Sequence, residues 1–265
     1  MYSPGALEAE LKGSIFADKL HFSEVTGSTN ADAQAAGLAG APHGSVWFAN
    51  EQTAGRGRGD HTWISTAGQG LYVSVLLRPQ MPVARLPLLA LVAGLAAADA
   101  IKAASGVSAD LRWPNDLLIG PRKTGGILVE SKTTEATIAF AVVGIGINVH
   151  QRAFASDLAT PATSLDLEAD RTVNRQTLLV TLLKSLEREA NLLLDAEVVK
   201  TVPARVAQAS TWVQGRWVEV HGPQTCVGVT EGLDEHGFLR VRTDGRLVTV
   251  QTGGIRAAQT REQAG

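Results

Sequence analysis

Residues 138–149 constrain the fold of this chain more than any other segment, because nearly every side chain in them is apolar. A run of this kind is typical of a β-strand that is covered on both faces. Residues 45–50, 71–77 and 126–131 are shorter runs bounded by turn signals, and they predict further strands. The chain is therefore expected to build a sheet with a buried central strand.

Two long helices are predicted beside these strands. Residues 87–104 are rich in alanine and leucine and predict a mostly buried helix. Asn174 is a suitable N-cap for a second helix running to about residue 194, because apolar side chains recur at helical spacing after it. The longest apolar run, residues 86–98, is shorter than the roughly 20 residues of a membrane-spanning helix, so no membrane span is expected.

The composition predicts a soluble cytoplasmic protein. Hydrophobic residues make up 45% of the 265 residues, which is enough for a sizeable core. The formal net charge of −2 argues against a generally basic nucleic-acid binder. The N-terminus lacks the pattern of a signal peptide, and the single cysteine, Cys226, allows no intramolecular disulfide, which fits a reducing compartment.

The sequence pattern changes near Thr211, which suggests two domains. Short strands are predicted at residues 217–220, 226–229, 238–241 and 247–250, and their spacing favours a small β-barrel. We therefore expect a large domain over residues 1–211, a barrel over residues 212–260 and a tail over residues 261–265. About 50 residues are few for an independent core, so the barrel is expected to pack against the large domain.

Residues 55–63, Gly-Arg-Gly-Arg-Gly-Asp-His-Thr-Trp, predict a mobile loop that folds over an anion. Glycine lets a ligand approach the main chain, and arginine supplies a charged planar fork that suits carboxylate or phosphate. The simpler alternative is a solvated flexible loop.

Other short motifs have both a functional and a structural interpretation. Asn115 and Asp116 follow Trp113-Pro114, where a strand is expected to end, and they either contact a ligand or form an Asx turn. Lys123, just before two glycines, either reaches a phosphate or lies in an exposed turn, and its spacing excludes a P-loop.

Two motifs contain small or polar residues at predicted element boundaries. The pair Gly144 and Gly146 lacks the third glycine of a dinucleotide motif, so it indicates close packing on a central strand. Thr29 or Asn30 is expected to cap a helix over residues 31–39, whose start offers N–H groups to a polar ligand. The six histidines show no metal-site spacing.

Taken in order, these motifs resemble those of the biotin protein ligases, the biotin–[acetyl-CoA-carboxylase] ligases. The resemblance covers about residues 20 to 260. It implies an α+β fold, with a biotin/lipoate ligase-type catalytic domain of mixed β-sheet and helices, followed by an SH3-like C-terminal barrel. About 20 residues precede the first motif, too few for the DNA-binding winged helix of some members, so the monofunctional type without DNA binding is implied.

The resemblance also implies a two-step reaction. Biotin and ATP would form biotinyl-5'-AMP and pyrophosphate, with Mg²⁺ held by the phosphates and Asp116 as a further candidate ligand. A lysine of a biotin carboxyl carrier domain of acetyl-CoA carboxylase would then take the biotin. The arginines of the loop would form the inner face of a lid over the adenylate.

The family motifs carry over to the following positions. The implied catalytic residues are Arg56, Arg58, Lys123 and Asp116. The implied biotin contacts are Ser28, Thr29, Asn30, Gln52, Gly55, Arg56, Arg58, Trp63, Lys123, Gly126 and Gly144. The implied nucleotide contacts are Arg58, Trp63, Asn115, Asp116, Lys123 and Asn148.

Two residues depart from the usual family pattern. Asp60 places a negative charge in a loop that would enclose an anionic adenylate, so we hypothesise that the loop releases the adenylate sooner than usual. Equal adenylate dissociation rates for Asp60→Gly and the parent would refute this. Arg112 stands where lysine often precedes the tryptophan, which keeps the charge but changes the hydrogen-bond geometry.

Competing interpretations come from several classes. A lipoate or octanoyl ligase shares the catalytic fold but needs an apolar acyl channel and lacks the Gly-Arg-Gly-Arg loop. A non-catalytic biotin or nucleotide sensor could dispense with Lys123, which is present. A transcriptional repressor is disfavoured by the short N-terminal segment and the slightly negative charge. The family includes monomers and dimers formed by sheet edges, so a homodimer stays open.

Overall fold

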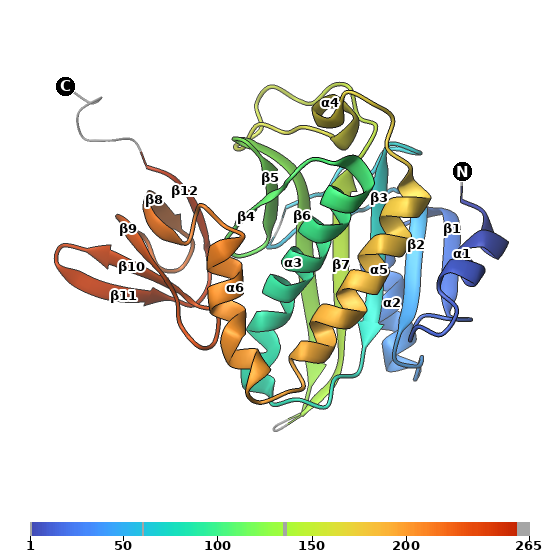
Figure 1. Ribbon diagram of the computed structural model, residues 1–265, viewed down its shortest axis with the longest axis horizontal. Coiled ribbons are helices and arrows are strands. Elements are labelled where there is room, and N and C mark those ends of the chain that lie inside the picture. The colour runs from blue at the N-terminus through green and yellow to red at the C-terminus, as the bar shows by residue number, and fades with distance from the viewer. Residues whose placement is uncertain (1, 60, 135–136, 259–265) are drawn as a thin grey trace.

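The computed structural model describes residues 2–59, 61–134 and 137–258, and this part of the chain forms two β-sheets (Figure 1). The larger sheet has seven strands in the order β1-β2-β3-β7-β6-β5-β4. Only the β1–β2 pair is parallel among its paired strands, so the sheet is mixed, as the resemblance implied. The strands are β1 (Leu20–Thr26), β2 (Ser45–Gln52), β3 (Gly70–Leu77), β4 (Asp110–Arg112), β5 (Asp116–Ile119), β6 (Arg122–Thr133) and β7 (Ile138–Asn148).

Helices cover both faces of the sheet at β7, which confirms the prediction for residues 138–149. The helices α3 (Leu86–Ser105) and α5 (Arg175–Leu192) lie side by side on one face, and α2 (Thr29–Leu38) packs on the other (Figure 1). Val142 belongs to the cluster that contains Ala33 of α2, whereas Val143 belongs to the cluster under α3 and α5. Because successive side chains of a strand point to opposite faces, a strand between two helical layers needs apolar residues throughout.

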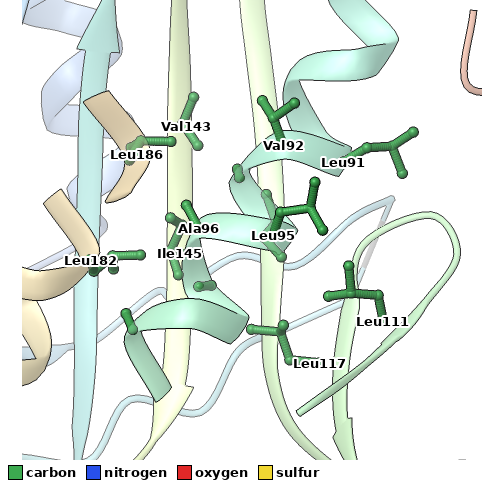
Figure 2. Close-up of a cluster of buried hydrophobic side chains, with 14 of the residues drawn as sticks. Leu91, Val92, Leu95, Ala96, Leu111, Leu117, Val143, Ile145, Leu182 and Leu186 are labelled. Atoms are coloured by element: carbon green, nitrogen blue, oxygen red, sulfur yellow. The ribbon is translucent and has the colours of Figure 1, made fainter. Parts of the chain in front are cut away.

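The main core lies between α3, α5 and the sheet. Figure 2 shows Leu95 of α3, Leu182 and Leu186 of α5, and Val143 and Ile145 of β7 converging there, all of them buried. Each aliphatic side chain buried in this way stabilises the fold by roughly 1.5–3 kcal/mol relative to exposure. The core therefore fixes β6 and β7, whose opposite faces carry the site described below.

Local sequence signals explain where α5 begins and where α3 ends. Asn174 caps α5, since its side-chain oxygen accepts hydrogen bonds from the backbone N–H groups of Gln176 (2.9 Å) and Thr177 (3.0 Å), as predicted. The helix α3 ends at Ser105, and Gly106 caps it with a φ of 81°, in the left-handed region that favours glycine.

The helix α3 is longer than the apolar run suggested. Together with a preceding 3₁₀ turn (Val83–Arg85), it is long and apolar enough by composition to cross a membrane. However, 61% of its most apolar 18-residue window is buried inside the protein. Burial of this kind is what the core helix of a globular domain shows.

The C-terminal sheet has five antiparallel strands in the order β11-β10-β9-β8-β12. They are β8 (Gln214–His221), β9 (Cys226–Leu233), β10 (Leu239–Thr243), β11 (Arg246–Val250) and β12 (Gly254–Ala257). The first four match the predicted strands, except that β10 begins one residue later than predicted, whereas β12 was not predicted. The expected domain boundary at residues 211/212 falls between α6 (Val202–Gln208) and β8. The predicted tail, residues 261–265, lies outside the described residues.

The C-terminal sheet packs against α3, as its small size led us to expect. The indole Nε1 of Trp113 donates a hydrogen bond to the backbone oxygen of Gly237 at 3.0 Å. Gly237 has a φ of 83°, and a Cβ there would lie 2.6 Å from Leu91 of α3. The turn between β9 and β10 therefore fits against the helix only because residue 237 is glycine.

Several shorter elements were not predicted from the sequence. These are α1 (Pro4–Glu10), β1, β5, α4 (Leu165–Ala169), a second 3₁₀ turn (Val198–Thr201) and α6. A strand was expected to end at Trp113, and β4 ends one residue before it. The strands β4 and β5 matter for function, because the chain between them carries Asn115 and leads into Asp116.

Candidate active site

A pocket opens on the α2 side of the sheet, between the start of α2 and strands β3, β6 and β7. It has a volume of about 430 Å³ and is open to solvent. Nine of the predicted site residues line it: Ser28, Thr29, Asn30, Gln52, Arg56, Trp63, Asn115, Gly126 and Gly144. The remaining lining residues are Tyr72, Val73, Ser74, Ile127, Leu128, Ile145 and Gly146.

The floor of the pocket is a network of hydrogen-bonded polar side chains. Gln52 Oε1 accepts from the backbone N–H of Thr29 at 2.9 Å, and Gln52 Nε2 donates to Ser65 Oγ at 2.7 Å. Thr29 Oγ1 lies 2.8 Å from Ser74 Oγ, which donates to Asn30 Oδ1 at 2.5 Å. Such a floor can match the donors and acceptors of a neutral polar ligand that is taken out of water.

Sequence reasoning did not identify Ser74. It lies in β3, whose residues are all buried, and it is itself fully buried. A hydroxyl in an otherwise apolar strand was the available signal, because buried polar groups need hydrogen-bond partners.

The helix cap was predicted wrongly. Ser28, with extended φ and ψ angles, is the N-cap residue, so Thr29 and Asn30 form the first turn of α2 rather than its cap. The hydroxyl of Ser28 makes no capping hydrogen bond, although its residue is only 5% exposed. The backbone N–H of Thr29 is already bonded to Gln52. What the start of α2 presents to the pocket is therefore three polar side chains, those of Ser28, Thr29 and Asn30.

The glycines of β7 allow close packing, as predicted. A Cβ at Gly144 would lie 2.0 Å from Asn30 Oδ1, and one at Gly146 would lie 2.6 Å from the ring of Trp63. A Cβ at Gly126 would be 3.5 Å from Lys123 and Trp63, which is an ordinary contact. Gly144 and Gly146 are thus required by their neighbours in this structure, whereas Gly126 is not.

A cluster of charges lies beside the pocket, around Asp116. Lys123 Nζ lies 2.6 Å from Oδ1 of this carboxylate, and Arg112 Nη2 lies 2.5 Å from Oδ2. Burial acts to raise the pKa of the Asp116 carboxyl, but the two cations outweigh burial and hold that pKa below its usual value. The three side chains therefore keep a net positive charge at neutral pH.

The structure refines two of the sequence interpretations at this cluster. Lys123 lies within β6 rather than in an exposed turn, and its ammonium group stands 5.5 Å from the centre of the Trp63 ring. Asn115 is fixed by two bonds to one residue: its Nδ2 donates to the backbone oxygen of Ile127 at 2.8 Å, and its own backbone oxygen accepts from Ile127 N. Both residues are therefore held by β6, which rests on the core.

The two arginines of the loop point to different partners. Arg56 lines the pocket, and its Nη2 lies 2.9 Å from Oε2 of Glu130 on β6. Arg58 instead donates to Thr252 Oγ1 at 2.9 Å and to the backbone oxygen of Gly253 in the C-terminal domain. Of the two arginines expected on the inner face of a lid, only Arg56 lines the pocket in this structure. Asp60, the unusual loop residue, lies outside the described residues.

Trp63 covers one wall of the pocket. Its ring lies against Gly146 and faces Lys123. The buried indole Nε1 has no hydrogen-bond partner among the described residues, so a donor is available at this wall. The base of the loop is tight, because a Cβ at Gly55 would lie 2.4 Å from the backbone oxygen of Trp63.

Five predicted site residues do not line the pocket. Asp116 and Lys123 lie in the charge cluster beside it, and Arg58 contacts the C-terminal domain. Gly55 supports the loop, and Asn148 Nδ2 donates to the backbone oxygen of Thr163 at 3.0 Å. Among the described residues, no three histidine, cysteine, aspartate or glutamate side chains gather as a metal site. Both oxygens of Asp116 are engaged by cations, so this carboxylate does not fit the role of a metal ligand in this structure.

Comparison with known proteins identifies relatives of the chain. Residues 22–148 match the model of the Biotin/lipoate A/B protein ligase family. The chain is 38% identical over 167 residues to the bifunctional ligase/repressor BirA of Bacillus spizizenii, which covers 62% of this chain and 51% of that protein. The chain thus spans about half the length of that relative.

Other relatives match over most of their length. The biotin–[acetyl-CoA-carboxylase] ligase of Mycobacterium tuberculosis is 35% identical over 241 residues, covering 87% of this chain and 85% of that protein. The ligase of the same name from Paracoccus denitrificans is 34% identical over 226 residues, covering 82% and 91%. The structure resembles biotin protein ligase from Aquifex aeolicus in complex with biotin and ATP, with a TM-score of 0.78, 27% identity, and coverage of 90% of this chain and 98% of that one. By sequence and by fold, the chain belongs to the biotin protein ligase family.

Proposed function

We propose that this protein is an ATP-dependent biotin–protein ligase. It forms biotinyl-5'-AMP and pyrophosphate from biotin and ATP, and then transfers biotin to a lysine of a biotin carboxyl carrier domain of acetyl-CoA carboxylase. The observation that carries the proposal is a polar-floored pocket that adjoins a cationic cluster, Lys123 and Arg112 around Asp116. A neutral ring system and an anionic tail, as in biotin, match these two parts.

The pocket floor suits the ureido group of biotin. That group has two N–H donors and one carbonyl acceptor, and each needs a partner when buried. Ser28, Thr29 and the Gln52 side chain are the polar groups at that floor, and the hydroxyl of Ser28 is free of any capping bond. Gly144 and Gly146 let Asn30 and Trp63 pack closely on β7, which places these two side chains at the wall of the pocket.

The cations suit the first chemical step. Two anions meet when the carboxylate of biotin attacks the α-phosphate, and negative charge grows on the phosphoryl oxygens. Lys123 and Arg56, already placed by β6 and the loop, stabilise that charge mainly through position and electrostatics. Burial lowers the pKa of the Arg58 guanidinium, and the Asp116 carboxylate acts in the opposite direction, so Arg58 interacts electrostatically with the same cluster.

The second step needs an orienting group for the incoming lysine. Asp116 stays ionised at neutral pH because its pKa is held low, so it can accept a hydrogen bond from the ammonium group of the acceptor. That group loses its proton to solvent before the neutral amine attacks the anhydride, the new amide bond forms and AMP leaves. The low pKa of Asp116 argues that the carboxylate orients this group rather than acting as a general base. Asn115 and Asn148 are assigned to the nucleotide, and Mg²⁺ is assigned to the phosphates alone.

The proposal is tested by incubating the protein with ATP, Mg²⁺ and biotin and measuring pyrophosphate release. Release that depends on biotin is expected, and replacing biotin with lipoate should abolish it. A folded protein that releases no pyrophosphate with biotin would refute the proposal, and preference for lipoate would favour a lipoate ligase. Biotinylation of a purified carrier domain by the purified protein tests the acceptor. The same reaction followed in a cytoplasmic extract tests the compartment.

A further inference from the structure

Glu130 is a charged side chain beside the pocket floor that the proposed reaction leaves without a role. It lies on β6, and the alternation of a strand places it on the same face as Gly126 and Leu128, which line the pocket. Two donors converge on its Oε2 atom: Asn30 Nδ2 at 2.8 Å and Arg56 Nη2 at 2.9 Å. Glu130 therefore connects the start of α2 and the loop to one strand of the sheet.

The charge of Glu130 sets the direction of the hydrogen bonds in the floor. A carboxylate can only accept hydrogen bonds, so Asn30 turns its amide nitrogen to Glu130 and its oxygen to Ser74. Ser74 Oγ donates its single proton to that oxygen, so it cannot donate to Thr29 Oγ1, 2.8 Å away; the Thr29 proton goes to Ser74 Oγ or to Gln52 Oε1 at 3.1 Å. The chain from Ser74 through Asn30 to Glu130 thus runs one way.

This direction decides what the pocket offers to a ligand. With its proton taken by Ser74 or Gln52, Thr29 Oγ1 presents a lone pair to the pocket and acts as an acceptor for a ureido N–H. In the reversed chain, Ser74 would donate to Thr29, and a Thr29 proton that is not bonded to Gln52 Oε1 would turn toward the ligand. A donor would then face a donor, which is costly when both are buried.

The second contact of Glu130 holds Arg56 at the rim of the pocket. The two side chains are 44% and 27% exposed, and a pair that meets solvent in this way contributes little to stability. Arg56 can therefore exchange Glu130 for the carboxylate of a ligand at little cost. The contact keeps the guanidinium within reach of that carboxylate before the ligand arrives.

We propose that Glu130 is a positioning residue of the biotin site, which fixes the hydrogen-bond direction of the floor through Asn30 and holds Arg56 at the rim. The inference rests on the proposed function and extends it to a residue that acts through Asn30 and Arg56. It predicts that Glu130 governs the Kd for biotin far more than the KM for ATP.

The test compares Glu130→Gln with the parent by calorimetric titration with biotin and by steady-state kinetics in ATP. The amide of the variant keeps the shape of the side chain. It carries no charge, and because it can both donate and accept, it no longer fixes the direction of the hydrogen bonds in the floor. The Kd for biotin should rise about tenfold or more, the scale of a lost hydrogen bond to a charged group, with the KM for ATP within about twofold. Ser74→Ala, which removes the first residue of the chain, should weaken biotin binding in the same way.

Two further variants separate positioning from a general structural effect. Glu231→Gln removes the same charge from the Arg242 pair in the C-terminal sheet, and it should leave both constants unchanged. In an Asn30→Ala background, Glu130→Gln should add less than about threefold to the Kd, because coupled residues are not additive.

Several outcomes would overturn the inference. These are a Kd within twofold of the parent in Glu130→Gln, equal rises in the Kd for biotin and the KM for ATP, or fully multiplicative effects with Asn30→Ala. If the parent itself neither binds biotin nor releases pyrophosphate, the proposed function falls and takes the inference with it. If the parent does both and the variants match it, only the role of Glu130 falls.

Discussion

Replacing Gly144 with alanine would place a methyl group 2.0 Å from Asn30 Oδ1 and 2.7 Å from its Cγ atom. Ordinary contact begins near 3.4 Å, so the oxygen must retreat by the difference, about 1.4 Å. Asn30 cannot retreat freely, because Ser74 and Glu130 bond to its two amide atoms at 2.5 and 2.8 Å. A shift of that size takes at least one of these bonds past the distance at which it counts as a hydrogen bond.

The cost has two parts that can be measured separately. Overpacking of a tight site costs about 1–3 kcal/mol of folding free energy, which for a chain of this size lowers Tm by about 2–4 °C per kcal/mol. The lost bond to the carboxylate of Glu130 adds about 1.5–3 kcal/mol to the cost of an ordered pocket, so biotin binding should weaken by at least about tenfold. Thermal unfolding and calorimetric titration with biotin report the two parts.

Two variants serve as controls for Gly144→Ala. In α3, a Cβ at Gly94 would meet Leu111 at 3.4 Å, an ordinary contact, and alanine is favoured over glycine within a helix, so Gly94→Ala should keep Tm and biotin affinity. The double variant of Gly144→Ala with Asn30→Ala removes the clash and should recover most of the lost Tm, while binding stays weak. Parental Tm and affinity in Gly144→Ala alone would refute the reasoning.

Three further outcomes follow from the structure. Lys123→Ala should lower biotin-dependent pyrophosphate release by about a hundredfold or more with the fold intact, because a placed cation is removed; near-parental turnover would contradict its role. The low pKa of Asp116 contributes folding stability that is present above the usual aspartate pKa of about 3.9 and is lost as pH falls through the lower pKa of the folded state. Asp116→Asn should therefore flatten the acid limb of a Tm–pH curve, and an unchanged limb would count against the ion pairs. Trp113→Phe strands the backbone oxygen of Gly237 and should cost about 1–3 kcal/mol in urea unfolding; an unaltered midpoint would show that this bond does not matter.

The sequence predicts those helices and strands in which buried apolar residues recur at regular spacing over many positions. The strand at residues 138–149 and the helix α5 have long apolar patterns, because each contacts the core over its whole length. Short strands lack this signal: β12 has four residues, opens with glycine, and forms only by pairing with β8, more than thirty positions earlier. Long-range pairing of this kind leaves no local pattern to detect.

The same distinction applies to the site. The order of motifs identifies residues that line the pocket or lie beside it, such as Gln52 and Lys123, but it does not identify the side chains that hold them. Glu130 lies within the predicted strand 126–131, and its role was not recognised. A carboxylate in an otherwise apolar strand needs hydrogen-bond or ionic partners, so its presence there was a signal of a polar site. Its partner Asn30 lies 100 residues earlier, so only the folded chain brings the two together.

The loop shows why composition alone could not assign its arginines. An antiparallel bridge between Arg56 and Thr62 narrows the loop, and Gly57 N donates to His61 O at 2.6 Å, so the hairpin directs side chains to both of its sides. Arg56 meets β6 of the catalytic sheet, and Arg58 meets a turn 194 residues later in the C-terminal domain. The first contact is a partly exposed ion pair that a ligand can exchange, whereas the second holds a half-buried guanidinium by two bonds. Arg58 therefore fixes the loop to the C-terminal domain, whereas the contact of Arg56 at the pocket can be exchanged for a ligand. Movement of the C-terminal domain would displace Arg58 first and leave the contact between Arg56 and Glu130 in place.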